Sequence, residues 1–437
     1  MSTGITLAIV GGGVAGCSAA YFARQAFPDA KIVLFEKSRR TGGRLHTVDF
    51  AEVRLELGAG FLHSSNQALI ALTDRLGVRR KTIERLGAGI WDGRGLVATI
   101  PAGFMGARLA LARRYGLPPL LHMRRLVRET LRRWVSVYRL PTRQTAFANP
   151  ADLLQRLDLF ARAQETSFDL LTSHRVTGPI LDELFSGISR AIFDQGLAIN
   201  GFAGTIAFIA AGFAAGHAWL LEDGNERLCT ALLRVSAVDV RLNSPVIALR
   251  SLEPRGGKTT EVLIRGEQSE NFDAVILATP IEVAGMDLRH AGAASVEPRE
   301  WHPVHVTCVA GRLSPEHFSA RVRSELPPTI LTTERVSFSS LRRVGFTPAG
   351  RAVYKIQSSS AVDDGVLRAL FSEVTDVRRH VWPAYPVLTP TIRWPAFRLR
   401  EGLYYVNAME SAVSTLETEV VASQNVVRLM REDHGSQ

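Results

Sequence analysis

Three glycines near the start of the chain, followed by an acidic residue, constrain its fold more than any other feature. Residues 5–16 read ITLAIVGGGVAG, so Gly11, Gly13 and Gly16 form G-x-G-x-x-G directly after an apolar run. Glu36 ends a second apolar run, KIVLFE. In a strand–turn–helix unit, such glycines place backbone N–H groups and a helix N-terminus against a pyrophosphate, and the acid binds a ribose 2′-OH. The motif predicts a Rossmann-type dinucleotide site.

The segment around these glycines has the composition of a complete β–α–β unit. Residues 5–10 suit a short buried strand, and residues 15–26 contain five alanines that favour close helix–sheet packing. A β–α–β turn without a nucleotide is the alternative. Glu36, unlike an Arg, disfavours a 2′-phosphate, so FAD or NAD is favoured over NADP. The unit is also expected to contact the cofactor through Val14, Ala15 and Lys37.

Two further glycine-rich turns follow the second predicted strand. The first is Gly42-Gly43-Arg44, and the second, Gly58-Ala59-Gly60-Phe61, comes after an alternating strand at residues 53–57. Such turns suit a long cofactor whose second half also needs backbone close by. Arg44 is a candidate phosphate partner, with a plain surface arginine as the alternative. Taken together, these motifs resemble those of the flavin amine-oxidase superfamily, which binds FAD.

The second half of the chain returns to the nucleotide-binding pattern. Residues 271–280 read NFDAVILATP, a hydrophobic strand that ends at Ala278, where backbone can approach a cofactor. Near the C-terminus a strand at residues 403–406 precedes a helix that begins close to Ser414 or Thr415, both good N-caps. The N-terminus of this helix could point at a flavin ring or be an ordinary capped end. The nucleotide-binding domain is therefore expected to be discontinuous.

The predicted fold class is α/β, with two domains. The FAD-binding domain, of Rossmann type, is assigned residues 1–75, 222–285 and 396–437. The substrate domain is assigned residues 76–221 and 286–395, as a mixed α+β unit with an antiparallel sheet and a helical insertion. A chain of 437 residues is long enough for two such cores.

The formal charge of +10 is concentrated in one segment. Residues 108–143 hold ten Arg and one acid, Glu129, a formal charge of +9. A packed helix with a solvated arginine face and a membrane-surface helix with Trp134 and Tyr138 near the interface are both open. No nucleic-acid-binding fold accompanies the charge, so no nucleic acid partner is expected. Apolar residues at helical spacing in this segment are Met123, Leu126, Val127, Leu131, Trp134 and Tyr138.

Several other features of the sequence bear on the cellular compartment in which the protein is expected. Residues 202–221 carry no formal charge but are rich in Gly and Ala, which favours a buried helix plus a turn over a membrane span. Three cysteines without a C-x-x-C pattern favour a reducing compartment, and the histidines form no metal-binding pattern. The N-terminus is not a signal peptide. A cytoplasmic location is predicted, with peripheral association to an anionic membrane left open.

Longer stretches make the resemblance more specific. The chain is similar to the prenylcysteine oxidases, also called prenylcysteine lyases, within the amine-oxidase-like FAD superfamily. The narrower markers are a Gly-Asn turn at residues 224–225 and NAMESA at residues 407–412. The resemblance also covers VGGGVAG, FEK with GGRL, GAGFLH, WLLEDGNERL, AVILATP and LYYVNAMESA. The arginine-rich composition indicates a bacterial source.

The resemblance implies roles for residues at matching motif positions. FAD would be bound by Gly11, Gly13 and Gly16, with Glu36 on the adenosine ribose. It also implies Gly43 and Arg44 near the pyrophosphate and flavin, Val246 at adenine, Glu410 beside the ribityl-pyrophosphate, and Leu416 near the flavin. Oligomeric state is not predicted.

The reaction implied by the resemblance is cleavage of a thioether in an S-prenyl or other S-alkyl cysteine. Hydride transfer from the carbon next to sulfur to flavin N5 would give an aldehyde, a thiol and, with oxygen, hydrogen peroxide. Many amine oxidases of the superfamily carry a Lys near flavin N5, whereas the corresponding strand here, residues 305–311, has none. The open alternatives are an amine oxidase or desaturase, and a non-catalytic flavin-binding membrane-peripheral protein. Candidate catalytic or positioning residues are Thr307, His63, His217 and Tyr385, and candidate cavity walls are Phe61, Phe208, Trp219, Trp382, Tyr385 and Trp394.

Overall fold

A computed structural model describes residues 4–140, 146–214, 216–252, 259–293, 296–318 and 326–435. Its nucleotide-binding part is built on a six-stranded sheet whose strands come from three separate parts of the chain. Neighbouring strands run parallel except the last pair, β21 and β20. In spatial order the strands are β10 (Asp239–Arg241), β2 (Lys31–Phe35), β1 (Thr6–Val10), β14 (Ala274–Leu277), β21 (Leu403–Tyr405) and β20 (Arg398–Arg400).

One face of this sheet is covered by helices that pack closely. The helix α1 (Val14–Ala26) starts directly after the glycine turn and packs against α9 (Arg227–Ser236) and α13 (Leu416–Gly435). Apart from Tyr21, its buried residues are small, half of the buried set being alanine, which lets the helix backbone approach the strands. An antiparallel sheet of β11 (Val246–Leu252), β12 (Thr259–Ile264) and β13 (Glu270–Phe272) adjoins β1 and β14. The Rossmann-type half predicted from the sequence is confirmed.

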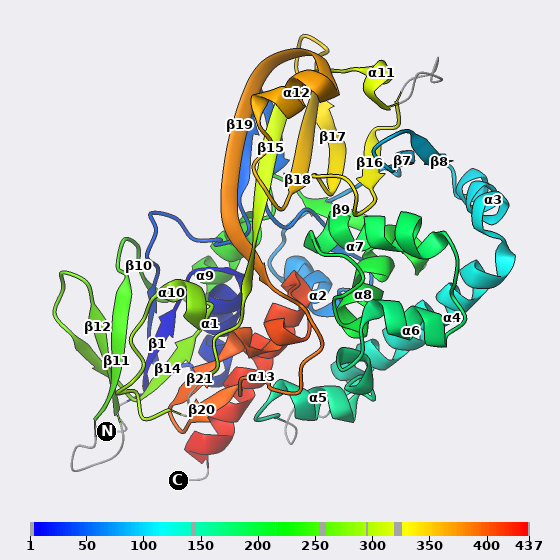
Figure 1. The fold of residues 1–437 in the computed structure, drawn as a ribbon. Helices are drawn as coiled ribbons and strands as arrows, with labels where there is room; N and C mark the ends of the chain where they lie inside the picture. The colour runs from blue at the N-terminus through cyan, green and yellow to red at the C-terminus, as the bar shows by residue number, and fades with distance from the viewer. Residues whose placement is uncertain are drawn as a thin grey trace.

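The second half is built on a seven-stranded sheet that is antiparallel except for the parallel pair β16 and β7. Its longest strands, β15 and β19, run from this sheet towards the nucleotide-binding part (Figure 1). The spatial order is β19 (Phe371–Pro386), β15 (Trp301–Leu313), β18 (Ala352–Ser358), β17 (Ser340–Phe346), β16 (Thr329–Thr332), β7 (Ala88–Trp91) and β8 (Leu96–Ile100).

Two small sheets join the nucleotide-binding half to the half built on the seven-stranded sheet. The hairpin of β3 (Thr47–Phe50) and β4 (Val53–Glu56) leads into the second glycine-rich turn. The strand β9 (Ala218–Leu221) pairs with both β5 (Leu62–His63) and β6 (Arg80–Thr82). The remaining short helices are α2 (Gln67–Arg75), α10 (Ile281–Ala284), α11 (Pro315–Phe318) and α12 (Asp364–Leu370).

A layer of helices packs beside the seven-stranded sheet (Figure 1). The helix predicted from the apolar spacing of the basic segment is confirmed, because Met123, Leu126, Val127 and Trp134 lie on the buried face of one helix. The layer consists of α3 (Phe104–Tyr115), α4 (Leu117–Trp134), the 3₁₀ turn η1 (Val135–Arg139), α5 (Pro150–Arg156), α6 (Ser167–Ser173), α7 (Ser186–Phe193), α8 (Gly201–Phe208) and the π-helical turn η4 (Ile209–Phe213).

Of the two alternatives left open for the basic segment, the packed helix fits Trp134 and Tyr138, and a place for these two rings at a membrane interface does not. The Trp134 ring is 3% exposed and packs against Phe202 with 5.7 Å between ring centroids. The Tyr138 hydroxyl donates to the carboxylate of Glu417 inside the molecule. Both aromatic rings lie on the inner face of their helical segment, so the outer face carries the arginines. Residues 141–143 of the basic segment lie outside the described residues.

The uncharged stretch at residues 202–221 forms the buried helix and turn that its composition indicates. Most of it lies in α8 and η4, but its last four residues form β9, which the sequence did not indicate. Among the helices that the structure describes, none combines the length and apolarity needed to cross a membrane.

Candidate functional site

The glycine turn forms a cradle whose three glycines have different roles. Gly11 has a φ of +110°, and a Cβ there would lie 2.6 Å from the carbonyl oxygen of Ala278. A Cβ on Gly16 would lie 1.9 Å from the carbonyl oxygen of Gly11. Gly13, in contrast, has open space where its Cβ would be, and no side chain caps the helix that begins at Val14 and Ala15. The turn is therefore closely packed at Gly11 and Gly16 and open at Gly13, as a site for an anion at a helix N-terminus requires.

Glu36 lies beside this cradle, at the end of β2. One carboxylate oxygen accepts the N–H of Gly12 at 2.7 Å and the other accepts that of Ser38 at 2.8 Å. Each oxygen keeps a lone pair for a ribose hydroxyl. The N–H of Ser244 donates to the Glu36 carbonyl at 3.0 Å, which brings the start of β11, with Val246, to this end of the sheet. Lys37 is exposed.

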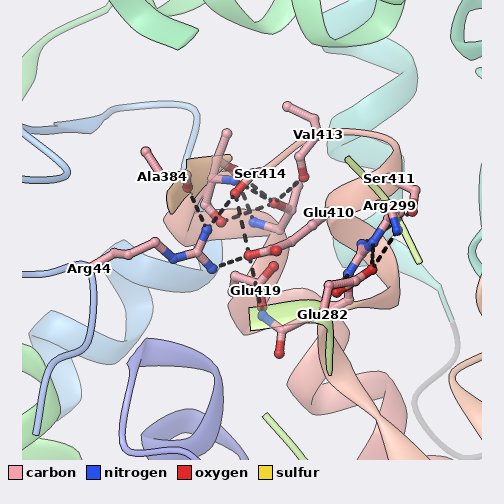
Figure 2. Close-up of polar contacts among 12 residues, drawn as sticks. Arg44, Glu282, Arg299, Ala384, Glu410, Ser411, Val413, Ser414 and Glu419 are labelled. Carbon is pink, nitrogen blue, oxygen red and sulfur yellow. Dashed lines mark hydrogen bonds and ion pairs between the residues drawn. The ribbon is translucent and has the colours of Figure 1, made fainter. Parts of the chain in front are cut away.

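The turn Gly42-Gly43-Arg44 lies directly on the glycine cradle. Gly43 has a φ of +56°, and a Cβ there would lie 3.2 Å from the Cα of Gly13. Gly58 is equally crowded, since its Cβ would lie 1.8 Å from the carbonyl oxygen of Arg44. Arg44 donates to the carbonyl of Ala384 at 2.8 Å and pairs with the carboxylate of Glu410 (Figure 2). Arg44 is thus a structural partner rather than a plain surface arginine.

The loop that carries Glu410 is held from two sides. It is the 3₁₀ segment η5 (Val406–Ser411), and all its residues are buried. Arg299 donates to the carbonyl of Asn407 at 3.0 Å and forms a two-point pair with Glu282, 2.6 Å at its shorter contact. Figure 2 shows this pair on one side of Glu410 and Arg44 on the other. The position of Glu410 is therefore fixed by both halves of the protein.

Three buried oxygen atoms around Glu410 have no hydrogen-bond partner among the described residues: Glu410 Oε2, Glu419 Oε1 and Asn407 Oδ1. Burial, and then the charge of Glu410, raise the pKa of Glu419 well above its usual range. A raised pKa favours the protonated form of Glu419 at neutral pH. A protonated Glu419 can donate to Glu410, which leaves Asn407 Oδ1 as the buried acceptor without a donor; because such an acceptor is costly, a ligand hydroxyl fits here. The ribityl chain of a flavin has such hydroxyls.

The Glu410 and Glu419 pair yields a matched prediction. We expect Glu419→Gln to leave the melting temperature nearly unchanged, because a neutral amide replaces an acid that is already protonated. Glu410→Gln removes the buried partner of Arg44 and should cost about 3 kcal/mol of unfolding free energy. Thermal and urea unfolding of the two variants at neutral pH measure the difference. Equal losses in both would show that the charge does not reside on Glu410.

The helix α13 begins where the sequence predicted, with Thr415 as its N-cap. The Thr418 N–H donates to the Thr415 hydroxyl at 3.2 Å. Within the first turn of α13, the buried carboxylate of Glu417 accepts the N–H groups of Ala68 at 2.8 Å and Leu69 at 3.0 Å, at the start of α2. Burial raises the pKa of Glu417 to about 7. This carboxylate ties α13, α2 and Tyr138 together beside Leu416.

A cavity of about 1050 Å³ opens in front of these elements. Its wall includes the second glycine-rich turn and the start of α13. Another part of the wall is apolar and comes from helices and from the loop after β6. A third part is polar and comes from β17 and β18. The lining includes Gly58, Ala59, Gly60, Phe61, Thr415 and Leu416; on the apolar side Ile83, Leu86, Leu131, Trp134, Phe193, Ile206 and Ile209; and on the polar side Ser340, Arg342, Lys355 and Gln357.

Two of the four candidate catalytic residues line this cavity. His63 is buried, and its Nδ1 accepts the N–H of Ser65 at 3.2 Å, which we assign as leaving the ring proton on Nε2. Burial, then the charges of Arg85 and His217, lower the pKa of His63, so its ring is neutral. Burial raises the pKa of Tyr385 to about 12. Both side chains are therefore neutral groups at neutral pH.

The other two candidate catalytic residues, Thr307 and His217, do not line the cavity. Thr307 pairs with Ile356, while its neighbour Cys308 pairs with Lys355. Because side chains alternate along a strand, Thr307 faces the buried core around Ile356, opposite the cavity side of Lys355. His217 is exposed and does not line the cavity. Of the candidate walls, Phe61 and Tyr385 line the cavity, whereas Phe208, Trp219, Trp382 and Trp394 do not.

The polar wall is a feature that the sequence did not reveal. Arg342 and Lys355 are cross-strand partners, and Ser340 and Gln357 form the next pair on the same face. Within the described residues Arg342 has no ion pair, and the side-chain nitrogen of Gln357 is buried without an acceptor. Lys355 donates to the carbonyls of Glu56 at 2.8 Å and Gly58 at 3.3 Å, and burial lowers its pKa to about 8. The sequence shows Lys355 and Gln357 within the largely apolar strand β18, and this was a signal for a polar wall. It does not show how β17 pairs with β18, so the wall itself could not be predicted.

Comparison with solved structures defines the class of the fold. The fold is similar to that of cyclohexylamine oxidase from Brevibacterium oxydans, with a TM-score of 0.67 and 15% identity over 99% of this chain and 100% of that chain. It is also similar to a putative protoporphyrinogen oxidase from Exiguobacterium, with a TM-score of 0.58 and 19% identity over 98% and 99% of the two chains. The protein thus has the amine-oxidase-like fold, with a Rossmann-like domain matched at residues 9–76.

Comparison of the sequence identifies the family. The prenylcysteine lyase family model matches residues 104–437. The farnesylcysteine lyase of Arabidopsis thaliana is 31% identical over 97% of this chain and 88% of its own length. Human prenylcysteine oxidase 1 is 27% identical over 97% and 88% of the two chains. The chain belongs to the prenylcysteine lyase family and is a flavin-dependent oxidoreductase.

Proposed function

We propose that this enzyme is an FAD-dependent oxidase that cleaves the thioether of an S-alkyl cysteine, with a prenyl chain as the alkyl group that fits best. The observation that carries the proposal is the division of the cavity wall into an apolar helical part and a polar strand part. An S-prenyl cysteine has the same division, a long apolar tail and a charged amino-acid head. The relatives named for farnesylcysteine and prenylcysteine support this substrate class.

FAD is the cofactor that the donors and acceptors of the site support best. The cradle at Gly13 and the carboxylate of Glu36 suit the pyrophosphate and adenosine ribose. Glu410 and its buried neighbours suit a ribityl chain, which NAD lacks. When bound, FAD would supply a two-electron acceptor for the hydride on the carbon next to sulfur. Oxygen is the proposed final acceptor, with hydrogen peroxide as its product.

The polar wall would bind the amino-acid head. Arg342 has no ion pair among the residues that the structure describes, so its guanidinium can take the substrate carboxylate, and the side-chain amide of Gln357 can donate a further hydrogen bond. Glu56 also lines the cavity, but its carboxylate is occupied by the Thr47 hydroxyl at 3.0 Å and the N–H of Asn225 at 2.8 Å. The apolar wall would hold the tail and exclude water from it.

The neutral polar groups of the cavity suit a reaction that needs no strong base. Loss of a hydride from the carbon next to sulfur leaves a cation that sulfur and the alkene stabilise. Water adds to this carbon, the C–S bond breaks, and the thiolate takes a proton, which yields an aldehyde and a thiol. The His63 Nε2–H and the Tyr385 hydroxyl are available to position that water.

The proposal is tested with the purified yellow protein and S-farnesyl cysteine. Anaerobic mixing should bleach the flavin absorbance, and aerobic turnover should release thiol, aldehyde and peroxide in equal amounts. S-methyl cysteine is the control for the apolar wall and should react far more slowly. A flavin-loaded protein that no prenyl thioether reduces would overturn the proposal.

Oxidation of an amine is a second candidate, favoured by one observation. The strand β15 has no Lys, but Lys355 on the adjacent strand lines the cavity, so the missing Lys of residues 305–311 is no argument against an amine. Family membership favours the thioether. Bleaching of the flavin by farnesylamine, with no response to S-farnesyl cysteine, would favour the second candidate.

A further inference from the structure

The outer surface of α3 and the first turns of α4 expose an unusual amount of apolar surface. Five large apolar side chains there are more than half exposed, from 54% for Phe104 to 75% for Met105. No residue of α3 is buried, and the helix lies at the edge of the molecule (Figure 1). We call this set the α3–α4 ridge; it comprises Phe104, Met105, Leu109, Leu117 and Leu121.

Helical spacing places arginines on the same outward faces. In α3, Arg108 lies one turn after Phe104, with its guanidinium 5.0 Å from the centroid of the Phe104 ring, and Leu109 lies one turn after Met105. In α4, Leu117 and Leu121 continue into Arg124, Arg125 and Arg128 at spacings of three and four residues. The buried face of α4 lies on the opposite side, with Met123, Leu126 and Val127. The ridge is thus bordered by arginines along its whole length.

These arginines are not neutralised within the described part of the chain. Arg114 pairs with Glu183, and Arg133 pairs with Glu129 and Asp158. The arginines of α3 and α4 for which the described residues provide no ion pair are Arg108, Arg113, Arg124, Arg125, Arg128 and Arg132. The charge of Arg128, then slight burial and the charge of Arg108, lower the pKa of Arg124. The arginines of both helices therefore act on one another as a single cationic surface.

The ridge adjoins the cavity of the proposed site. The Arg85 guanidinium stacks on the Phe104 ring at 5.7 Å from its centroid. The loop that holds Arg85 also carries Ile83 and Leu86, which line the cavity, and Leu86 is itself exposed. From the other side, Leu131 and Trp134 of α4 line the same cavity. The helices α3 and α4 therefore carry the α3–α4 ridge on their outer surface, while the end of α4 forms part of the cavity wall.

We propose that the α3–α4 ridge docks the enzyme on an anionic membrane surface, with the apolar side chains among the headgroups and the arginines on lipid phosphates. Charge complementarity selects this occupant. A lipid surface offers a dense layer of negative charge over apolar chains, and long apolar side chains flanked by arginines match both. The cavity would then lie beside the membrane that holds an apolar substrate. The docking itself does not depend on the thioether reaction.

Vesicle flotation of the flavin-loaded enzyme tests the proposal. Phosphatidylcholine vesicles with phosphatidylserine should carry the protein to the top of the gradient, and vesicles without phosphatidylserine should bind about tenfold less. Raised salt should release the protein. The triple variant Met105→Ser, Leu109→Ser, Leu121→Ser should lose about tenfold in binding, and Arg124→Gln with Arg128→Gln should lose the dependence on phosphatidylserine.

The matched control is Ile392→Ser, because Ile392 is apolar and 78% exposed but lies outside the ridge. It should float like the parent protein, and every variant should keep the melting temperature and flavin content of the parent. Absence of flotation by the parent protein would overturn the proposal. So would a change from dimer to monomer in the triple variant, because the ridge would then be a contact between two copies of the chain.

Discussion

Replacing Gly13 with Ala is expected to give a folded protein that binds flavin much more weakly. The backbone of Gly13 has a φ of −75° and a ψ of −175°, which an alanine adopts without strain, and its Cβ would enter open space. That open space is where a pyrophosphate approaches the N-terminus of α1. The methyl group should therefore weaken flavin binding at least about tenfold, since it holds the phosphates away from the backbone N–H groups.

Flavin absorbance per protein and titration of the apoprotein with FAD measure this effect, and circular dichroism measures the fold. The matched control is Gly95→Ala, because Gly95 also has open space at its Cβ but lies far from the cradle in sequence. Gly16→Ala provides the contrast, since its Cβ would strike the Gly11 carbonyl and should lower the melting temperature as well. A Gly13→Ala protein with full flavin content would show that the cofactor does not use this cradle.

Arg342→Ala should lower kcat/KM for S-farnesyl cysteine by about 30-fold, mainly through KM. An arginine–carboxylate hydrogen bond in a shielded site contributes about 2 kcal/mol, which corresponds to that factor. The methyl ester of the same substrate has no carboxylate, so the variant should process it nearly as well as the parent does. The comparison of the two substrates separates loss of a binding partner from general damage to the cavity.

Arg351→Ala is the control for this prediction. Arg351 precedes β18 on the same hairpin but pairs with Glu373 on the surface, so its loss should change neither substrate. Flavin content should stay constant in both variants, because Arg342 belongs to the polar wall and not to the glycine cradle. An equal loss for acid and ester would mean that Arg342 shapes the cavity without binding the carboxylate.

The parts of the fold that the sequence predicted correctly are those set by local signals. The glycine turn, the alanine-rich helix and the strand that ends at Glu36 follow one another in the chain, so their spacing alone determines the unit. The same holds for the cap at Thr415, where a hydroxyl meets an N–H three residues later. The placement of FAD on individual residues stays a prediction.

The cavity could not be predicted in the same way because it depends on strand register. A shift of one residue in β15 would turn Thr307 towards the cavity and Cys308 away from it. The approach of Arg342 and Lys355 likewise depends on how β17 pairs with β18, which the apolar pattern of each strand leaves open. The sequence left the place of Trp134 and Tyr138 open because an aromatic residue on a basic helix suits a packed face as well as an interface; the structure buries Trp134 and bonds Tyr138 to Glu417.

The link between Arg44 and Glu410 joins residues 366 positions apart in the chain. The strand β21 and the helix α13, which complete the sheet and pack on α1, also come from the last part of the chain. During synthesis on a ribosome, the glycine cradle therefore emerges long before the residues that close the other side of the cofactor site. A prematurely terminated product would display the phosphate-binding turn without the means to retain a flavin. Retention of a flavin would therefore require the last residues of the chain as well as the first.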